Sequence, residues 1–505
     1  HRDDDFWTGP LTIDTPGDGV NTVGYGNATI DADVCDEFDR FWETTREQAA
    51  LHLAYYACLN DANCVTADNF PDGYVIPVVF DQWPGNGDES KMQDRYIAPF
   101  FDYNKDGFYD PSDGDYPGYD LLKTESCPKP RGGSVNLFGD YNLWYIFNDK
   151  GNIHTESGGN PIGMEIRAQA FAFATNDEIN SMTFYNYELI NRSPTKLNET
   201  YFGQYVDADI GCSGDDYAGC DVQRGFGYVY GGTQVDGLEC FGSIPWSDGV
   251  SPAIGVDFFE GPYQDNDLVD NPLTTDVALA ISEKGIPYEG LGLGYGDGVV
   301  DNERMGMSRF VYFSRAGTGP SFGGDPGTAI EYYNYMRGLW LDGTPFYFGG
   351  LGHNSDATVQ TLGEIEADYI FPGDTDPLFW GTGGTPTPQD WTEQTAGNPV
   401  GDRRFLQAAG PFTLEPGALN NITVGVVYAR ASGGDPFESV ELVKLADDKA
   451  QKLFDNCFRL IDGPDAPDVS IKEFDKELVI LLSNNESVSN NRFESYFAKD
   501  PNINL

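Results

Sequence analysis

The sequence predicts a mostly β fold, a β-sandwich of jelly-roll or Ig-like type with long calcium-ordered loops. Gly (61 residues) and Pro (31) are abundant without a G-X-Y period, which suits a loop-rich β protein. Tyr (29) and Phe (33) are plentiful while Met is scarce at 6, and aromatic residues favour strands. Strand-sized runs alternate with long loops rich in Gly, Asp and Pro. An apolar content of 40% excludes a disordered chain.

The strand pattern is clearest in the middle of the chain. Residues 168–173 and 182–190 alternate between apolar and polar, which predicts two antiparallel strands joined around 175–177. Further strands are expected at 227–230, 309–314 and 422–429.

Two helical segments interrupt this pattern. Apolar residues recur every three or four positions over 436–460, and the same spacing predicts a short helix within 36–59. After the second helix, residues 469–482 alternate like the opening strands of an Ig- or fibronectin-like domain. That domain would be incomplete at residue 505, which suggests a longer polypeptide.

Length and punctuation predict three parts, because 505 residues exceed what one small core accommodates. Residues 1–133 form a loop-rich segment with a short helix and a calcium loop. Residues 134–462 form the main β-sandwich domain and end in the amphipathic helix. Residues 466–505 begin a further β domain.

The charge balance restricts the partners. With 81 acidic and 30 basic residues the formal net charge is −51, which repels nucleic acid and anionic lipid. No run of eighteen apolar residues occurs, so direct membrane insertion is not expected. Two explanations of the charge stay open: a solvated surface adapted to salty water, and a set of metal sites.

Cysteine usage indicates an oxidising compartment. The eight Cys include no C-x-x-C pair and only four His are present, which argues against zinc. An even count suits disulfides in a secreted protein. Cys58–Cys64 and Cys212–Cys220 are the local pairs we consider, although sequence does not fix the connectivity.

One acidic segment fits the twelve-position calcium loop. Calcium requires six to eight hard oxygen ligands, and alternate residues on a tight turn converge on one point. Gly107 occupies the position where the chain must bend, and Asp115 is a substitute for the short Asp at position twelve. The alternative is a solvated Asp-rich turn. The predicted ligands are Asp102, Asn104, Asp106, Phe108 through its carbonyl, Asp110 and Asp113.

A second acidic cluster follows a predicted strand. Five carboxylates within fifteen residues repel one another unless a cation lies between them. A plain acidic loop and a catalytic carboxylate pair are the alternatives. This cluster consists of Asp207, Asp209, Asp215, Asp216 and Asp221. Weaker metal candidates, which Asx turns also explain, are Asp297, Asp301, Asn302, Glu303, Asp374 and Asp376, of which we retain Asp301.

Catalytic motifs are missing from the sequence. It contains no G-x-S-x-G, H-E-x-x-H, P-loop or dinucleotide fingerprint, so we do not expect an enzyme. Glycoside hydrolysis by a carboxylate pair stays open, because it requires only spatial proximity. Tryptophans at 246, 340, 380 and 391 would suit sugar stacking, but burial in the core is the commoner fate of Trp.

Several strings are similar to a known group of proteins. They include the calcium loop continuing into Gly114-Asp115-Tyr116-Pro117, and the strings GNIHTESGGNPIGMEIRAQAFAFATNDEIN, MTFYNYELINRS and GQYVDADIGCSGDDYAGCDVQRGFGY. Others are GDGVVDNERMGMSRFVYF, EYYNYMRGLWLDGTP, DRRFLQAAGPFTLEPG and ADDKAQKLFDNCFRLIDGPDAPD. Between about residues 35 and 468 the chain resembles the N-terminal region of large Bacteroidota cell-surface proteins exported by the type IX secretion system.

The resemblance implies export and further β domains, but no settled enzymatic activity. It supports calcium at the matching acidic positions, and it implies that a Cys212–Cys220 bridge would be local to this chain. We therefore expect an extracellular, calcium-binding structural or adhesive protein, such as an adhesin, surface-layer or filament component. Its expected partners are calcium, copies of itself and other surface proteins or glycans. The alternative is a carbohydrate-binding or glycan-degrading surface protein.

Overall fold

The computed structural model describes residues 5–13, 28–118, 139–237, 240, 245–246, 250–455, 458, 468–474 and 477–483. The chain divides into two compact units, the first formed by residues 1–120 and 135–451 and the second by residues 121–134 and 452–505. The domain boundaries predicted at 133 and at 462–466 lie outside the described residues. Strands make up 30% of the described residues and helices 21%, so the prediction of a β-rich fold is confirmed.

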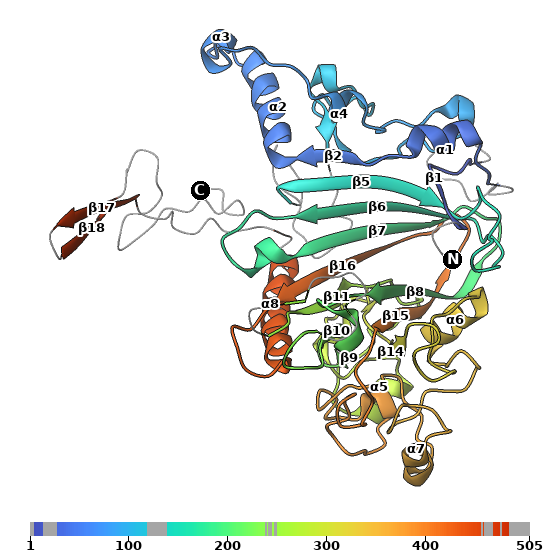
Figure 1. Cartoon of the computed structure of the whole chain (residues 1–505). Helices are drawn as coiled ribbons and strands as arrows, with labels where there is room; N and C mark the ends of the chain where they lie inside the picture. Colours follow the sequence, from blue (N-terminus) through green and yellow to red (C-terminus); the bar gives the residue numbers. More distant parts are fainter. Residues whose placement is uncertain are drawn as a thin grey trace. The chain divides into compact units, whose positions relative to one another are not determined.

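A large antiparallel sheet organises the first unit (Figure 1). Its order is β1 (Trp7–Thr8), β5 (Tyr141–Asn148), β6 (Met164–Ala172), β7 (Thr183–Asn191), β16 (Leu419–Ala429), β11 (Ala253–Glu260), β10 (Phe226–Gly231) and β9 (Asp216–Asp221), with β2 (Trp42–Thr45) also on β5. The predicted antiparallel pair at 168–173 and 182–190 is β6 and β7. The strands predicted at 227–230 and 422–429 are β10 and β16.

A second sheet shares a hydrophobic core with the first. It has the order β14 (Arg309–Ser314), β15 (Arg403–Leu414) and β8 (Leu197–Asp207), and β14 matches the strand predicted at 309–314. Phe310 and Phe405 of this sheet join Val229 and Val256 of the large sheet in one core cluster. Burying these side chains is the main stabilising contribution to the unit. Two shorter pairs are β3 (Phe100–Phe101) with β4 (Tyr116–Pro117), and β12 (Gly292–Leu293) with β13 (Arg304–Met305).

Helix α8 (Phe437–Asp455) packs on the large sheet and confirms the helix predicted at 436–460. Its apolar residues at three- and four-residue steps are buried, among them Val440, Val443 and Ala450. At its first turn, the Phe437 ring contacts the rings of Tyr228 and Tyr230 on β10, with centroids 6.2 and 5.4 Å away.

The short helix predicted within 36–59 is confirmed, but it begins only at residue 46. Residues 32–38 form α1 (Ala32–Phe38), residues 42–45 form strand β2, and α2 (Arg46–Leu59) follows. Trp42 is 3% exposed and its ring contacts Trp144 of β5 at 5.4 Å, so this tryptophan is part of a strand edge and not of a helix face. Thr45 then starts α2 with a capping box to Gln48. The packing of Trp42 against β5 therefore makes residues 42–45 a strand, although the spacing of the apolar residues over 36–59 is helical.

The remaining α-helices of the described segments are short. They are α3 (Thr66–Asn69), α4 (Val78–Asp81), α5 (Val277–Ser282), α6 (Ala329–Arg337) and α7 (Ala357–Leu362). In the second unit, the predicted strand region at 469–482 forms two antiparallel strands, β17 (Asp468–Phe474) and β18 (Glu477–Ser483).

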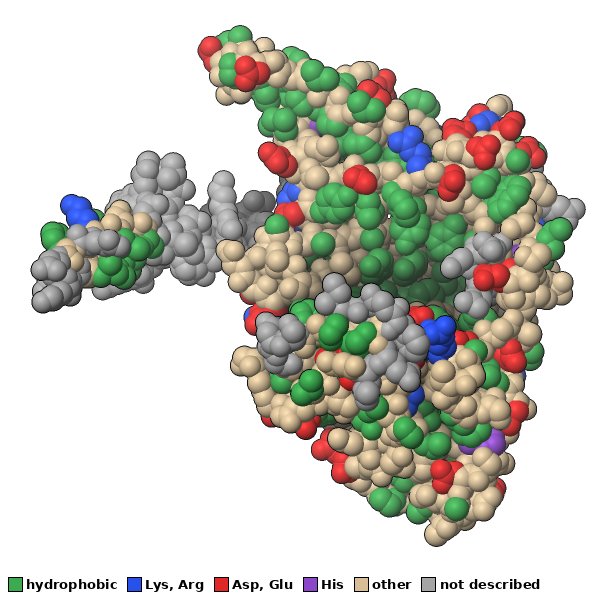
Figure 2. All heavy atoms as spheres, viewed as in Figure 1, with side chains coloured by type: hydrophobic (Ala, Val, Ile, Leu, Met, Phe, Trp, Pro, Cys, Tyr) green, Lys and Arg blue, Asp and Glu red, His purple; other side chains and the backbone are tan. Residues whose placement is uncertain are grey.

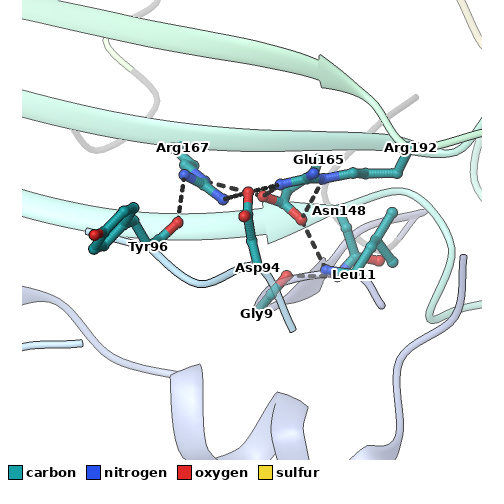
Figure 3. A network of polar contacts seen from close by, with 8 residues as sticks. All are labelled: Gly9, Leu11, Asp94, Tyr96, Asn148, Glu165, Arg167 and Arg192. Carbon is teal, nitrogen blue, oxygen red and sulfur yellow. Dashed lines mark hydrogen bonds and ion pairs between the residues drawn. The ribbon is translucent and has the colours of Figure 1, made fainter. Parts of the chain in front are cut away.

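A buried ionic network ties the N-terminal segment to the large sheet (Figure 3). Glu165 of β6 is fully buried and lies 3.0 Å from Arg167 Nε and 3.1 Å from Arg192 Nη2. Its other oxygen accepts the backbone N–H of Leu11 at 2.9 Å. Asp94 contacts both guanidinium groups, at 2.8 Å from Arg192 and 3.3 Å from Arg167. Segments far apart in sequence are therefore joined through one carboxylate.

Candidate metal centre

Three carboxylates meet at the end of the second sheet. One oxygen from each of Asp207, Asp209 and Asp402 lies within 4.8 Å of the others. Asp207 is the last residue of β8, and Asp402 directly precedes β15. Because β8 and β15 pair antiparallel, with Arg404 opposite Asp207, the end of one strand lies beside the start of the other. The sheet register thus assembles a group that is scattered in the sequence.

One arginine partly neutralises this cluster. Arg404 Nε lies 2.9 Å from Asp207 and 3.5 Å from Asp325, and its Nη1 lies 3.1 Å from Asp402. Arg315 is more distant, 4.0 Å from Asp402. Asp209 contacts no cationic side chain among the residues that the structure describes. The acids outnumber the bases, so the cluster retains a negative charge that a divalent cation would neutralise.

Asp216 of β9 lies next to this cluster. It is fully buried, and its backbone exchanges two hydrogen bonds of 3.2 Å with Gly401, the neighbour of Asp402. One carboxylate oxygen accepts the Ile210 N–H at 3.2 Å, and the other has no hydrogen-bond donor in the described part of the chain. Burial, followed by repulsion from Asp215 and Asp209, raises the pKa of Asp216 to about 9.

The other two acids of the predicted second cluster lie elsewhere. Asp215 ends the short helix η6 (Ser213–Asp215) and accepts hydrogen bonds from Thr233 Oγ1 at 2.6 Å and Gly237 N at 3.3 Å. Asp221 is five residues after Asp216 on β9, so the alternation of the strand puts it on the opposite face of the sheet. The structure therefore brings Asp207 and Asp209 together, with Asp216 alongside, and adds Asp402.

The disulfides partly differ from the sequence expectation. Cys58–Cys64 forms, but Cys212 pairs with Cys240, so the Cys212–Cys220 pairing is wrong. Cys220 is a fully buried, free thiol near the end of β9, where its side chain belongs to the core. Cys212 directly precedes η6 (Ser213–Asp215). Cys35 is free, and Cys127 and Cys457 lie outside the described residues.

The predicted calcium loop closes around Asp102. One oxygen of Asp102 accepts the N–H of Lys105 at 2.6 Å, and the other accepts the N–H of Gly107 at 2.8 Å. Gly107 has φ of +77°, the left-handed conformation that position six requires. Asn104 Oδ1 accepts the Asp106 N–H, and Asp106 accepts the N–H of Phe108. The polar side chains on the alternate positions 102, 104 and 106 therefore converge on the inside of the turn.

Asp113 and Asp115 differ in their surroundings. Asp113 belongs to the short helix η3 (Pro111–Asp113) and is exposed. Asp115 is fully buried, and its two oxygens accept the N–H groups of Tyr103 at 2.8 Å and Asp110 at 2.9 Å. Burial raises the pKa of Asp115 to about 6. Asp115 thus holds the two ends of the loop together, and Asp113 is the side chain left accessible to an ion.

The weaker candidates organise turns. Asp301 accepts the N–H groups of Asp267 and Leu268, at 2.8 and 2.9 Å. Asp376 accepts the Tyr288 hydroxyl at 2.7 Å and the Trp380 N–H at 2.9 Å. Asp297 accepts the Val299 N–H, Asn302 donates to Asp297, and Glu303 accepts the Asn271 N–H. The Asp374 side chain makes no hydrogen bond of this kind to the residues that the structure describes, and it lines a cavity of about 410 Å³.

Sequence reasoning missed Asp402 and Arg404. Both follow Gly401 at the start of a strand nearly two hundred residues from Asp207, and no local spacing links them. Of the four tryptophans considered for sugar binding, Trp340 and Trp391 are buried in the core, and Trp246 and Trp380 are half-buried.

No protein-family model matches the chain, and no curated protein matches it at a significant level. Within the described ranges, no helix has both the length and the hydrophobicity needed to cross a bilayer.

Proposed function

We propose that the protein is an extracellular structural or adhesive component of a cell surface, with loops ordered by calcium. The observation that carries the proposal is the cluster of Asp207, Asp209 and Asp402, whose charge Arg404 only partly neutralises. The carboxylates are hard oxygen donors of the kind calcium prefers. A bound ion would neutralise them and hold the start of β15 and the end of β8 together.

The loop at 102–113 would supply a second site. Asp102, Asn104 and Asp106 would be ligands, together with the Phe108 carbonyl, Asp110 and Asp113. Isolated loops of this kind bind calcium at about 10⁻⁴ to 10⁻³ M, concentrations found outside cells. An ion that binds only the folded state stabilises that state by mass action, by about 2.7 kcal/mol at one hundred times the Kd.

The same proposal covers the compartment, the type of sandwich and the assembly of the protein. The disulfides Cys58–Cys64 and Cys212–Cys240 support an oxidising compartment, and the resemblance to type IX secretion cargo supports export to the cell surface. We assign the two packed sheets to a sandwich of jelly-roll or Ig-like type. Self-assembly into a layer or filament is the role we favour, and catalysis is not part of the proposal.

Metal content and melting together test the proposal. Protein purified without chelator should retain calcium after dialysis, measured by elemental analysis. Calcium should raise the melting temperature of the chelated wild type. Asp209→Asn and the pair Asp102→Ala with Asp106→Ala should each reduce that rise. The matched control is Asp72→Asn, which changes an exposed aspartate away from both sites. Metal-free native protein with identical melting curves in calcium and chelator would overturn the proposal.

A second candidate, glycan binding, is favoured by an aromatic surface on the large sheet. Tyr145 and Phe147 of β5 stack at 6.0 Å, and Tyr185 and Tyr187 of β7 stack at 6.4 Å, with all four rings half-buried. Figure 2 shows hydrophobic side chains gathered in a hollow over β5, β6 and β7. Flat aromatic surfaces suit the apolar faces of sugars. A glycan array probed with wild type and with Tyr145→Ala would test this candidate. It requires that the wild type bind at least one glycan and that the variant lose this binding.

A further inference from the structure

Two buried aspartates from distant parts of the chain meet under helix α8. Asp257 on β11 is 1% exposed and Asp447 on α8 is 2% exposed. Their carboxyl groups lie within hydrogen-bonding range of each other, and one oxygen of each has no hydrogen-bond donor among the described residues. Two ionised carboxylates are both acceptors, so a hydrogen bond between them requires a proton on one of the two.

The sheet register explains why Asp257 faces the helix. Phe226 of β10 lies opposite both Asp221 of β9 and Asp257 of β11, so the three side chains share one face. On the far side of Asp257, β16 presents Gly425, which has no side chain. Helix α8 covers this face, with Phe437 against Tyr228 at its first turn and Asp447 further along.

The surrounding charges do not neutralise the pair. Arg224, in the turn between β9 and β10, contacts Asp221 at 2.9 Å and Asp448 of α8 at 2.9 Å. Lys444 of α8 lies 3.0 Å from Glu441 and 3.8 Å from Asp221. Both cations in this interface are thus engaged by other carboxylates, and five acids face two bases. The next lysine along α8, Lys449, pairs with Glu178.

A buried proton is the consequence of this imbalance. Burial and the charge of the partner, with Asp221 adding to the repulsion, raise the pKa of Asp257 well above its ordinary value. Burial and the nearby Asp448 raise that of Asp447. The folded state therefore retains a proton that the unfolded chain loses above a pH of about 4. Stability from this pair is present at low pH and is lost as the pH rises through the raised folded value.

We propose that Asp257 and Asp447 share one proton that holds helix α8 on the large sheet, so that alkaline pH loosens the helix. This inference is independent of the proposed calcium sites, because neither residue belongs to them. Loss of this proton leaves two negative charges facing each other in a water-poor interface. The helix must then move so that water can hydrate them.

Infrared spectroscopy and hydrogen exchange on the full chain test the proposal. At neutral pH the wild type should show a carbonyl band of a protonated carboxylic acid, and the pair Asp257→Asn with Asp447→Asn should reduce it. Exchange of the amides at 437–455, corrected for the intrinsic rate, should rise by up to about tenfold per pH unit while the folded state keeps the proton that the opened state loses, and should level off once the folded state is deprotonated too. In the double variant this rise should be missing, whereas Asp72→Asn should behave like the wild type.

Two results would overturn the proposal. One is exchange at 437–455 that is independent of pH between 7 and 10 in the wild type. The other is α8 exchange that accelerates on calcium removal at constant pH in the wild type but not in the double variant, since a cation would then neutralise the pair. If the double variant does not fold, Asp447→Asn alone replaces it, because its amide can donate to Asp257 as the shared proton does. The band should then weaken and α8 should stay protected.

Discussion

Arg404 forms an ion pair with Asp207, the residue directly opposite it in the β15–β8 pairing, with 2.9 Å between its Nε and the carboxylate. The same guanidinium lies 3.1 Å from Asp402. A cross-strand pair thus also sets the electrostatics of the candidate metal centre. In the absence of an ion, Arg404 is the main source of positive charge for this cluster. Removing Arg404 should therefore increase the contribution that calcium makes to stability.

Arg404→Met should lower the melting temperature in chelator and enlarge the rise produced by calcium. The chelated protein loses a partly buried ion pair, on the order of 1–3 kcal/mol. Calcium then meets a more negative site and binds more tightly. Differential scanning fluorimetry with and without calcium measures both effects. Arg404→Lys is the control, because it retains the charge without the planar fork. An unchanged calcium response in Arg404→Met would argue against metal at this cluster.

The disulfide Cys212–Cys240 leads to a second prediction. Cys240→Ser should destabilise the protein by about 2–4 kcal/mol, because the bridge closes a loop of 28 residues. Native protein treated with iodoacetamide should remain unlabelled at Cys220, since burial both shields this thiol and raises its pKa.

Peptide mapping checks the connectivity directly. After unfolding in denaturant without reductant, Cys220 should become labelled, and a peptide pair should link Cys212 with Cys240. A linked pair containing Cys220 would contradict the structure. Cys220→Ser serves as the matched variant, because it removes the free thiol and should leave the Cys212–Cys240 link intact.

Strands could be predicted from the sequence where the alternation of apolar and polar residues alone indicates them. Alternation along 182–190 and 422–429 reflects burial of one face, and both segments are strands of the large sheet. Asp207 and Asp209 were identified because they crowd together in sequence. Asp402 was not, since only the β8–β15 register brings it near them. The Cys212 pairing failed for the same reason: the strand alternation that directs Cys220 into the core depends on the second sheet packed there.

Asp113 and Asp115 should respond differently to substitution. Asp115→Ala leaves the N–H groups of Tyr103 and Asp110 without their acceptor, so it should destabilise the N-terminal region by about 2–4 kcal/mol with or without calcium. Asp113→Ala should leave the chelated protein unchanged and reduce only the calcium-induced stabilisation. Limited proteolysis at 102–115 with and without calcium distinguishes the two. Equal effects of both substitutions would contradict the assignment of Asp113 as a ligand.

The Glu165 network predicts a pH-dependent loss of stability. Burial disfavours the ionised form of Glu165, but Arg192 and Arg167 outweigh it and lower its pKa. A carboxylate with a lowered folded pKa stabilises the protein fully above its unfolded pKa of about 4.3, and the contribution is lost as the pH falls through the folded value. Arg192→Met should therefore cost about 3–5 kcal/mol at pH 7, because it leaves Glu165 buried beside a single remaining arginine.

The difference between Arg192→Met and wild type should shrink as the pH falls, because Glu165 of the variant takes up a proton at a higher pH than Glu165 of the wild type and then no longer requires a cation. Urea unfolding of both proteins at pH 7 and at pH 3.5 measures this difference in the free energy of unfolding. The control is Lys196→Met, which removes an exposed ion pair with Glu415 of similar length, 2.8 Å. That pair is solvated, so its loss should cost less than about 1 kcal/mol at either pH. A pH-independent cost for Arg192→Met would mean that its packing, and not the charge of Glu165, holds the N-terminal segment on the sheet.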